Sequence, residues 1–168
     1  MKLFDQLFVA TIGCVTALFL LTQPAPAQSS RPASQAASKA EHEGAKRTHR
    51  LILQVNTNDP AMMNLALNNA TNVDQYYSNL GERVEIEIVT FGAGLHMLRA
   101  DTSPVKDRIK SIAESRPSIS FNACDNTREN MAKAESKEIP LVSQATVVKS
   151  GVVRVIELQE QGWSYVRP

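Results

Sequence analysis

The residue best suited to chemistry in this sequence is one cysteine, Cys124, which follows a predicted strand over residues 118–123. Polar residues that suit the start of a helix follow it at once. Free amides and the positive end of a helix dipole favour a thiolate, which is the nucleophilic form of cysteine. Arg128 would add to this effect and Asp125 would oppose it. Cys124 is therefore a candidate nucleophile, and the alternative is a small buried residue that only packs.

Two other loops are expected to bring polar groups to the same place. They follow the apolar runs 51–55 and 84–91, which are predicted to be strands. In an open parallel sheet, ligands bind outside the carboxyl ends of the strands, so loops that leave this edge can share a pocket. A histidine there could act as a base or stabilise a thiolate. The candidate ligand-binding residues are Asn56, Gly92, Gly94, His96 and Asn126.

Several other chemistries lack their motifs. The turn at Gly92 and Gly94 has Met97 where a dinucleotide fingerprint needs its third glycine. There is no G-x-S-x-G elbow and no phosphate-binding lysine loop. Met62, Met63, Met97, His96 and Cys124 are soft ligands without a motif-like spacing, and three histidines with one downstream cysteine make no zinc set. We therefore predict neither a metal nor a bound cofactor.

Strand-like and helix-like segments alternate along the chain. Strands are predicted at 51–55, 84–91, 118–123, 141–148 and 163–166. Helices are predicted from Pro60, over 105–116, after a cap at Asn126 with Glu129 completing a capping box, and over 151–161, with a helical turn at 95–98. Such alternation implies right-handed crossovers and a mainly parallel sheet of about five strands, covered on both faces.

The helix from Pro60 has the strongest pattern. Asp59 suits its N-cap, Pro60 its first position and Gly81 its end. Three- and four-residue spacing defines one buried face. The members of this face are Met63, Ala66, Ala70, Val73, Tyr77 and Leu80.

The N-terminus has the pattern of a secretory signal. Lys2 precedes an apolar run over residues 7–21, and small residues precede an expected cleavage after Ala27. We predict a signal peptide over 1–27, a flexible linker over 28–47 and a domain over 48–168, hence a periplasmic or secreted protein with no membrane segment after cleavage. A retained anchor or a lipid on Cys14 are the alternatives. If Cys14 is removed, Cys124 has no partner for an internal disulfide.

Three segments together resemble the DsrE/DsrF-like sulfur-relay family. They are residues 121–127 (Phe-Asn-Ala-Cys-Asp-Asn-Thr), residues 91–95 (Phe-Gly-Ala-Gly-Leu) and the tail over 150–168. The resemblance covers the domain from about His49. It implies a three-layer α/β/α fold and assembly into trimers or hexamers.

The same resemblance implies a sulfur, or persulfide, carrier or sulfurtransferase. Cys124 would accept a sulfane sulfur from a donor protein or compound and pass it to an acceptor. The family's relay proteins work in the cytoplasm, so an exported member would need a donor outside it. Two alternatives stay open: a non-catalytic oligomeric module that binds a small ligand, and a redox-responsive thiol protein. The net charge of +1 gives no indication of a nucleic-acid partner.

Overall fold

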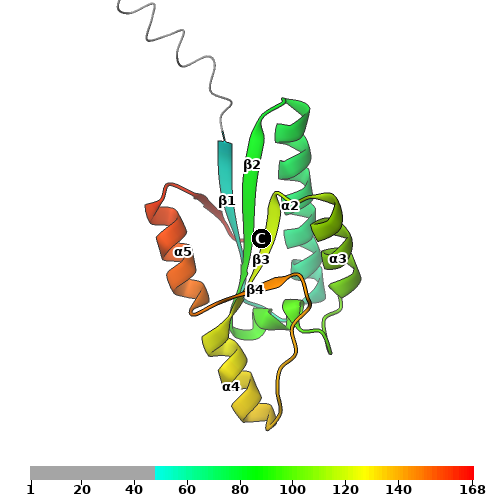
Figure 1. Cartoon of the computed structure of the whole chain (residues 1–168), viewed down its shortest axis with the longest axis vertical. Helices are drawn as coiled ribbons and strands as arrows, with labels where there is room; N and C mark the ends of the chain where they lie inside the picture. The colour runs from blue at the N-terminus through cyan, green and yellow to red at the C-terminus, as the bar shows by residue number, and fades with distance from the viewer. Residues whose placement is uncertain (1–47) are drawn as a thin grey trace, which may run out of the picture. The chain divides into compact units, whose positions relative to one another are not determined.

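The structure, a computed structural model, describes residues 48–168. The predicted signal peptide (1–27) and linker (28–47) lie outside this range. The elements, in chain order, are β1 (Thr48–Val55), α2 (Pro60–Asn79), β2 (Arg83–Thr90), the 3-10 helix η1 (Gly92–Leu98), α3 (Lys106–Ser115), β3 (Ile119–Cys124), α4 (Asp125–Glu135), β4 (Ala145–Val148), α5 (Gly151–Glu160) and β5 (Ser164–Val166) (Figure 1).

The five strands form one sheet in the order β4-β3-β2-β1-β5. Every neighbouring pair is parallel. Helices α2 and α3 lie on one side of the sheet and α5 lies on the other (Figure 1). The predicted three-layer α/β/α architecture with a parallel sheet is confirmed. All carboxyl ends of the strands therefore lie at one edge, as the site prediction requires.

The two faces of the sheet differ in their cores. The face toward α2 and α3 carries the larger core, to which Leu53, Ile88 and Phe121 contribute from the three central strands. The face toward α5 has a small apolar core of Ile52, Val89, Val155 and Leu158, with Phe91 and Trp163 packed against it. The α5 face thus leaves room for polar side chains on the central strands.

Helix α2 begins as predicted. The Asp59 carboxylate accepts a hydrogen bond from the Ala61 amide at 2.8 Å, and Pro60 takes the first helical position. Gly81 follows the helix with a φ of +70°, a conformation that favours glycine. The prediction that Leu80 is buried is wrong, because Leu80 is 57% exposed. It is the C-cap residue, so it lies past the last turn that keeps the buried face.

Helix α4 starts earlier than predicted. Cys124 itself is the N-cap, and no side chain caps this helix, so the predicted capping box at Asn126 is wrong. The reason is that β3 continues directly into α4 without a connecting loop. The backbone N–H of Asn126 donates instead to the backbone carbonyl of Lys149 at 3.3 Å. Helix α4 has no buried residue and extends beyond the carboxyl end of β3 (Figure 1).

Strand β4 is shorter than the predicted strand over residues 141–148. Its first residue is Ala145, and Leu141 instead forms an isolated antiparallel bridge with Arg99. Arg99 is the residue that follows η1, and its bridge with Leu141 keeps Leu141 out of the parallel sheet. No sequence pattern reveals this pairing. Among residues 48–168, no helix combines the length and apolarity needed to cross a membrane.

Candidate functional site

Cys124 lies at the carboxyl edge of the sheet. It is the last residue of β3, pairs with Val148 of β4 and precedes the first residue of α4. Its thiol is free, and the residue is only 4% exposed. The prediction of a strand-end cysteine at a helix N-terminus is confirmed by this geometry. The thiol is nevertheless closed off from solvent.

The cover over Cys124 is the start of α5. Because side chains alternate along a strand and Phe121 and Ala123 belong to the large core, Cys124 lies on the opposite, α5 side. A Cβ added to Gly151 would lie 3.2 Å from the Cys124 Cβ and 2.8 Å from the Phe91 Cδ1. Only glycine allows such a close approach. The N-termini of α4 and α5 therefore meet at Cys124.

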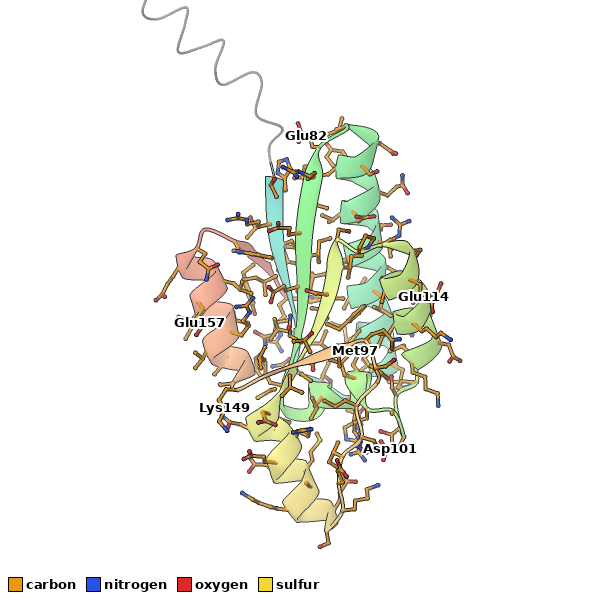
Figure 2. The ribbon with its side chains drawn as sticks, in the orientation of Figure 1. Glu82, Met97, Asp101, Glu114, Lys149 and Glu157 are labelled. Atoms are coloured by element: carbon orange, nitrogen blue, oxygen red, sulfur yellow. The ribbon has the colours of Figure 1, made fainter. Side chains whose placement is uncertain are left out.

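Neither of these two helices has a side-chain cap. Ser150 occupies the N-cap position of α5 without a hydrogen bond from its side chain to the helix. Lys149 lies just before it, where β4 leads into α5 beside the start of α4 (Figure 2). Uncapped first-turn amides attract anions. Cys124 therefore lies where the starts of two helices come together.

A polar network lies on the same side of the sheet. Arg154 of α5 donates from Nε and Nη2 to the two carboxylate oxygens of Glu87, at 2.9 and 2.5 Å. The Asn122 Nδ2 donates to the Glu87 Oε2 at 2.9 Å. Glu87 is 9% exposed and Asn122 5%. The hydrogen bonds to Glu87 raise the pKa of the Arg154 guanidinium, so Arg154 stays charged across the physiological range.

Sequence analysis missed this network. The sequence feature that could have indicated the network is Glu87, which lies in the middle of the mostly apolar strand predicted over residues 84–91. Its partner Arg154 is 67 residues away, on a helix whose position depends on strand order. Asn122 is two residues before Cys124 and points to the same side of β3. The network therefore joins α5 to the strand that carries the thiol.

The loop after β2 packs tightly on the end of β1. A Cβ on Gly94 would lie 2.1 Å from the Val55 carbonyl oxygen and 2.8 Å from the Asn56 Cα. The Gly92 amide donates to the Thr127 Oγ1 in the first turn of α4 at 3.0 Å. The structure thus brings Asn56, Gly92 and Gly94 together near the start of α4. Their role is close backbone packing.

The other predicted ligand residues are less central. His96 shares a hydrogen bond of 3.2 Å between its Nδ1 and the Thr102 Oγ1, and the structure describes no hydrogen bond from it to Cys124. Asn126 is exposed, and its amide is engaged by Lys149. His96 therefore has a partner in the loop after η1, and nothing in the described contacts makes it a base for the thiol.

Helix α4, lacking buried residues, is fixed at its far end by charge. Arg99 is 1% exposed and donates to the carboxylates of Asp101, at 2.8 Å, and Glu135, at 2.9 Å. Lys137 also contacts both carboxylates at 3.2 Å. Hydrogen bonds from Arg99 lower the pKa of the Asp101 carboxyl and bring that of Glu135 to about 2. Hydrogen bonds to Asp101 and Glu135 in turn raise the pKa values of both Arg99 and Lys137.

The main apolar groove lies away from the thiol, whereas a hollow of about 320 Å³ near it is lined by Val148, Ser150 and Arg154. A groove of about 440 Å³ runs between α2, β1 and β5, with Leu51, Val73, Tyr76 and Val166 in its lining. At the carboxyl edge, Asn56 lines a hollow of only about 40 Å³. Cys124 lines none of these hollows. Within residues 48–168, no group of three or more His, Cys, Asp or Glu side chains is placed to hold a metal ion.

Fold and site together define a three-layer α/β/α protein with one thiol at the carboxyl edge of a parallel sheet. No family model matches the chain, and no curated protein matches it. Among solved structures, it is similar to a protein of unknown function, MTH1491 from Methanobacterium thermoautotrophicum, with a TM-score of 0.61 and 27% sequence identity. The match covers 71% of this chain and 99% of that chain. The architecture thus occurs there as an entire protein chain.

Proposed function

We propose that this protein is a DsrE/DsrF-like sulfur carrier that uses Cys124 as its only exchanging thiol. The observation that carries the proposal is the meeting of two helix N-termini without side-chain caps, those of α4 and α5, at a free cysteine. Helix N-termini in general attract anions, and both the thiolate and the persulfide exchanged in sulfur transfer are anions. The resemblance of residues 121–127 to the family's active-cysteine segment supports the same role.

The proposed reaction needs a single cysteine. The Cys124 thiolate attacks the terminal sulfur of a donor persulfide, a new S–S bond forms, the donor's S–S bond breaks, and the donor leaves as a thiolate. In the second step an acceptor thiolate attacks the terminal sulfur held by Cys124. The bond to Cys124 breaks, and Cys124 leaves as a thiolate. Sulfur moves without net oxidation, so neither a cofactor nor a second cysteine is required.

Mass spectrometry tests the proposal directly. Purified protein incubated with polysulfide or thiosulfate is expected to gain mass in steps of one sulfur atom, and peptide mapping should place the gain on Cys124. Cys124→Ser should abolish it, whereas Cys14→Ser should not. If neither donor adds sulfur to a protein whose Cys124 can be alkylated, the proposal is wrong.

The proposal includes location and assembly. We place the carrier outside the cytoplasm, as a trimer or hexamer that exchanges sulfur with a donor and an acceptor there. The signal-like pattern over residues 1–27 supports the location. Exposed aromatic side chains of Tyr76 and Tyr165 support self-association.

A second candidate function is a small-ligand-binding module. The groove of about 440 Å³ favours it, because the groove is large enough for a small molecule and is lined by apolar and aromatic side chains. Binding of an apolar fluorescent dye that Tyr76→Ala weakens and Cys124→Ser leaves unchanged would support this candidate. Sulfur loading of Cys124 without dye binding would count against it.

A further inference from the structure

We propose that the first turn of α5 is a movable cover over Cys124, and that the ion pair between Arg154 and Glu87 holds it closed. The inference rests on the proposed function, since it says when the thiol can exchange sulfur. Arg154 and Glu87 are then positioning residues, which act on the thiol through α5 and do not touch the transferred sulfur.

The first step of the argument is burial. Sulfur exchange requires a thiolate to approach an S–S bond from outside, yet Cys124 is 4% exposed. Some element must move before the thiol can react with a donor or acceptor. Helix α4 is a poor candidate for this movement, because Cys124 is its N-cap and β3 continues directly into it. Helix α5 covers Cys124 through Gly151 and belongs to a distant part of the chain.

The second step is how α5 is attached. Its buried apolar residues, Val155 and Leu158, lie after its first turn. In the first turn, Val152 and Val153 are about half exposed, and the one buried residue is Gly151, which has no side chain. The first turn therefore has no apolar anchor. It can lift while Val155 and Leu158 stay packed against the sheet.

The third step is the ion pair. Arg154, three residues after Gly151, donates hydrogen bonds to both carboxylate oxygens of Glu87 on the central strand β2. Glu87 is also held by Asn122 of β3, so the anchor point is fixed from two sides. Glu157 is a weaker neighbour, with an oxygen 3.8 Å from the Arg154 Nη1. The Glu87 pair is thus the strongest polar attachment described for the start of α5.

Glu87→Gln tests this arrangement and keeps the shape of the side chain. The measurement is the rate at which iodoacetamide alkylates Cys124 in the native protein, with peptide mapping to separate Cys124 from Cys14. We expect the rate to rise about tenfold or more, because a charge-assisted contact to the cover is lost. Glu85→Gln is the matched control. Glu85 lies two residues away on the same side of β2 and pairs with Arg50 in an exposed ion pair at 3.3 Å.

Further measurements separate a cover from simple loss of stability. At low urea, alkylation should be independent of denaturant, as expected for local opening, and faster than global unfolding allows. Arg154→Lys, which keeps the charge but not the paired geometry, should give an intermediate rate and serves if Glu87→Gln does not fold. The double variant Glu87→Gln/Arg154→Gln should react no faster than the faster single variant.

The outcomes distinguish this inference from the proposed function. Equal alkylation rates in Glu87→Gln and Glu85→Gln, or alkylation of the native protein only through global unfolding, would overturn the cover. Faster alkylation of Glu87→Gln without sulfur uptake by any variant would support the cover and reject sulfur transfer. Faster alkylation together with faster sulfur uptake supports both.

Discussion

At the scale of single residues, Gly151 determines how closely α5 approaches the Cys124 thiol. An added methyl group would meet the side chain of Phe91 at 2.8 Å and the Cys124 Cβ at 3.2 Å. Packed interiors have little room for such an addition, so either the phenyl ring or the start of the helix must shift. The absence of a side chain at residue 151 is therefore part of how Cys124 is covered.

Gly151→Ala is expected to raise the alkylation rate of Cys124 and to lower the free energy of unfolding. Overpacking costs about 1–3 kcal/mol, partly offset by the better helix propensity of alanine, about 1 kcal/mol. Urea denaturation and iodoacetamide kinetics measure the two effects. Val152→Ala, on the same turn but exposed, is the control and should change neither quantity by much. An unchanged alkylation rate in Gly151→Ala would contradict the close approach.

The sequence allowed part of this site to be predicted. Cys124 could be placed at a strand end because an apolar run precedes it and helix-forming residues follow. The convergence of Asn56, Gly92 and Gly94 followed from the parallel sheet. The contact of Gly151 with Cys124 could not be predicted, because it requires the face on which α5 packs. The hydrogen bond between His96 and Thr102 could not be predicted for a similar reason, since it depends on the path of the loop after η1.

At the scale of elements, α4 depends on the charged cluster around Arg99. The helix has no buried side chain. Its last residue, Glu135, forms an ion pair with Arg99, which also pairs with Asp101. Arg99 is itself buried, so loss of its carboxylate partners would leave a guanidinium in the interior without compensation. The position of α4, and with it one of the two helix N-termini at Cys124, is tied to the ionisation of these carboxyls.

Acid should therefore loosen α4 within a defined pH window. The pKa of Glu135 is about 2 in the folded protein, below its ordinary value of 4.5, and that of Asp101 is also lowered. A lowered folded-state pKa stabilises the fold above the ordinary value, and this contribution is lost as pH falls through the folded-state value. We expect the free energy of unfolding to decline from about pH 4.5 toward pH 2.

Glu135→Gln tests the source of that decline. The variant should be less stable than the wild type at neutral pH and should show a shallower dependence between about pH 4.5 and 2, measured by urea denaturation at each pH. Glu129→Gln is the control on the same helix. Glu129 is exposed and has only Lys149 as an ion-pair partner, at 3.6 Å. Identical pH profiles for wild type and Glu135→Gln would refute the assignment.

The order and type of the elements could be predicted well, and their ends less so. Alternating apolar runs and helical periodicity are local properties, so the β/α order was available from the sequence. The start of α4 and the length of β4 depend on tertiary contacts. Asn126 bonds to Lys149 instead of capping a helix, and Leu141 pairs with Arg99 outside the sheet. A capping box and an apolar run could not reveal those partners.

For the whole molecule, self-association is the expectation that follows from the exposed surface. Apolar side chains lie exposed on α2 and β5, including Tyr76, Leu80 and Val166, and others lie on the outer side of α5. Contiguous exposed apolar surface marks interaction sites more often than chance. The DsrE/DsrF-like assembly that we propose predicts the mass of a trimer or hexamer in light scattering coupled to gel filtration. A monomer at all concentrations would contradict the expectation.

Removal of the proposed signal peptide would determine which cysteines the mature protein contains. If the signal over residues 1–27 is removed, Cys14 leaves with it, and Cys124 cannot be sequestered in an internal disulfide in an oxidising compartment. We expect the protein recovered outside the cytoplasm to begin at Gln28, as measured by N-terminal sequencing and intact mass. Ala27→Arg should block this cleavage, because the peptidase requires a small residue there. Ala33→Arg, in the predicted linker, should be processed normally. A mature protein that keeps Cys14 would contradict the single-thiol carrier, since two cysteines could then pair or both take up sulfur.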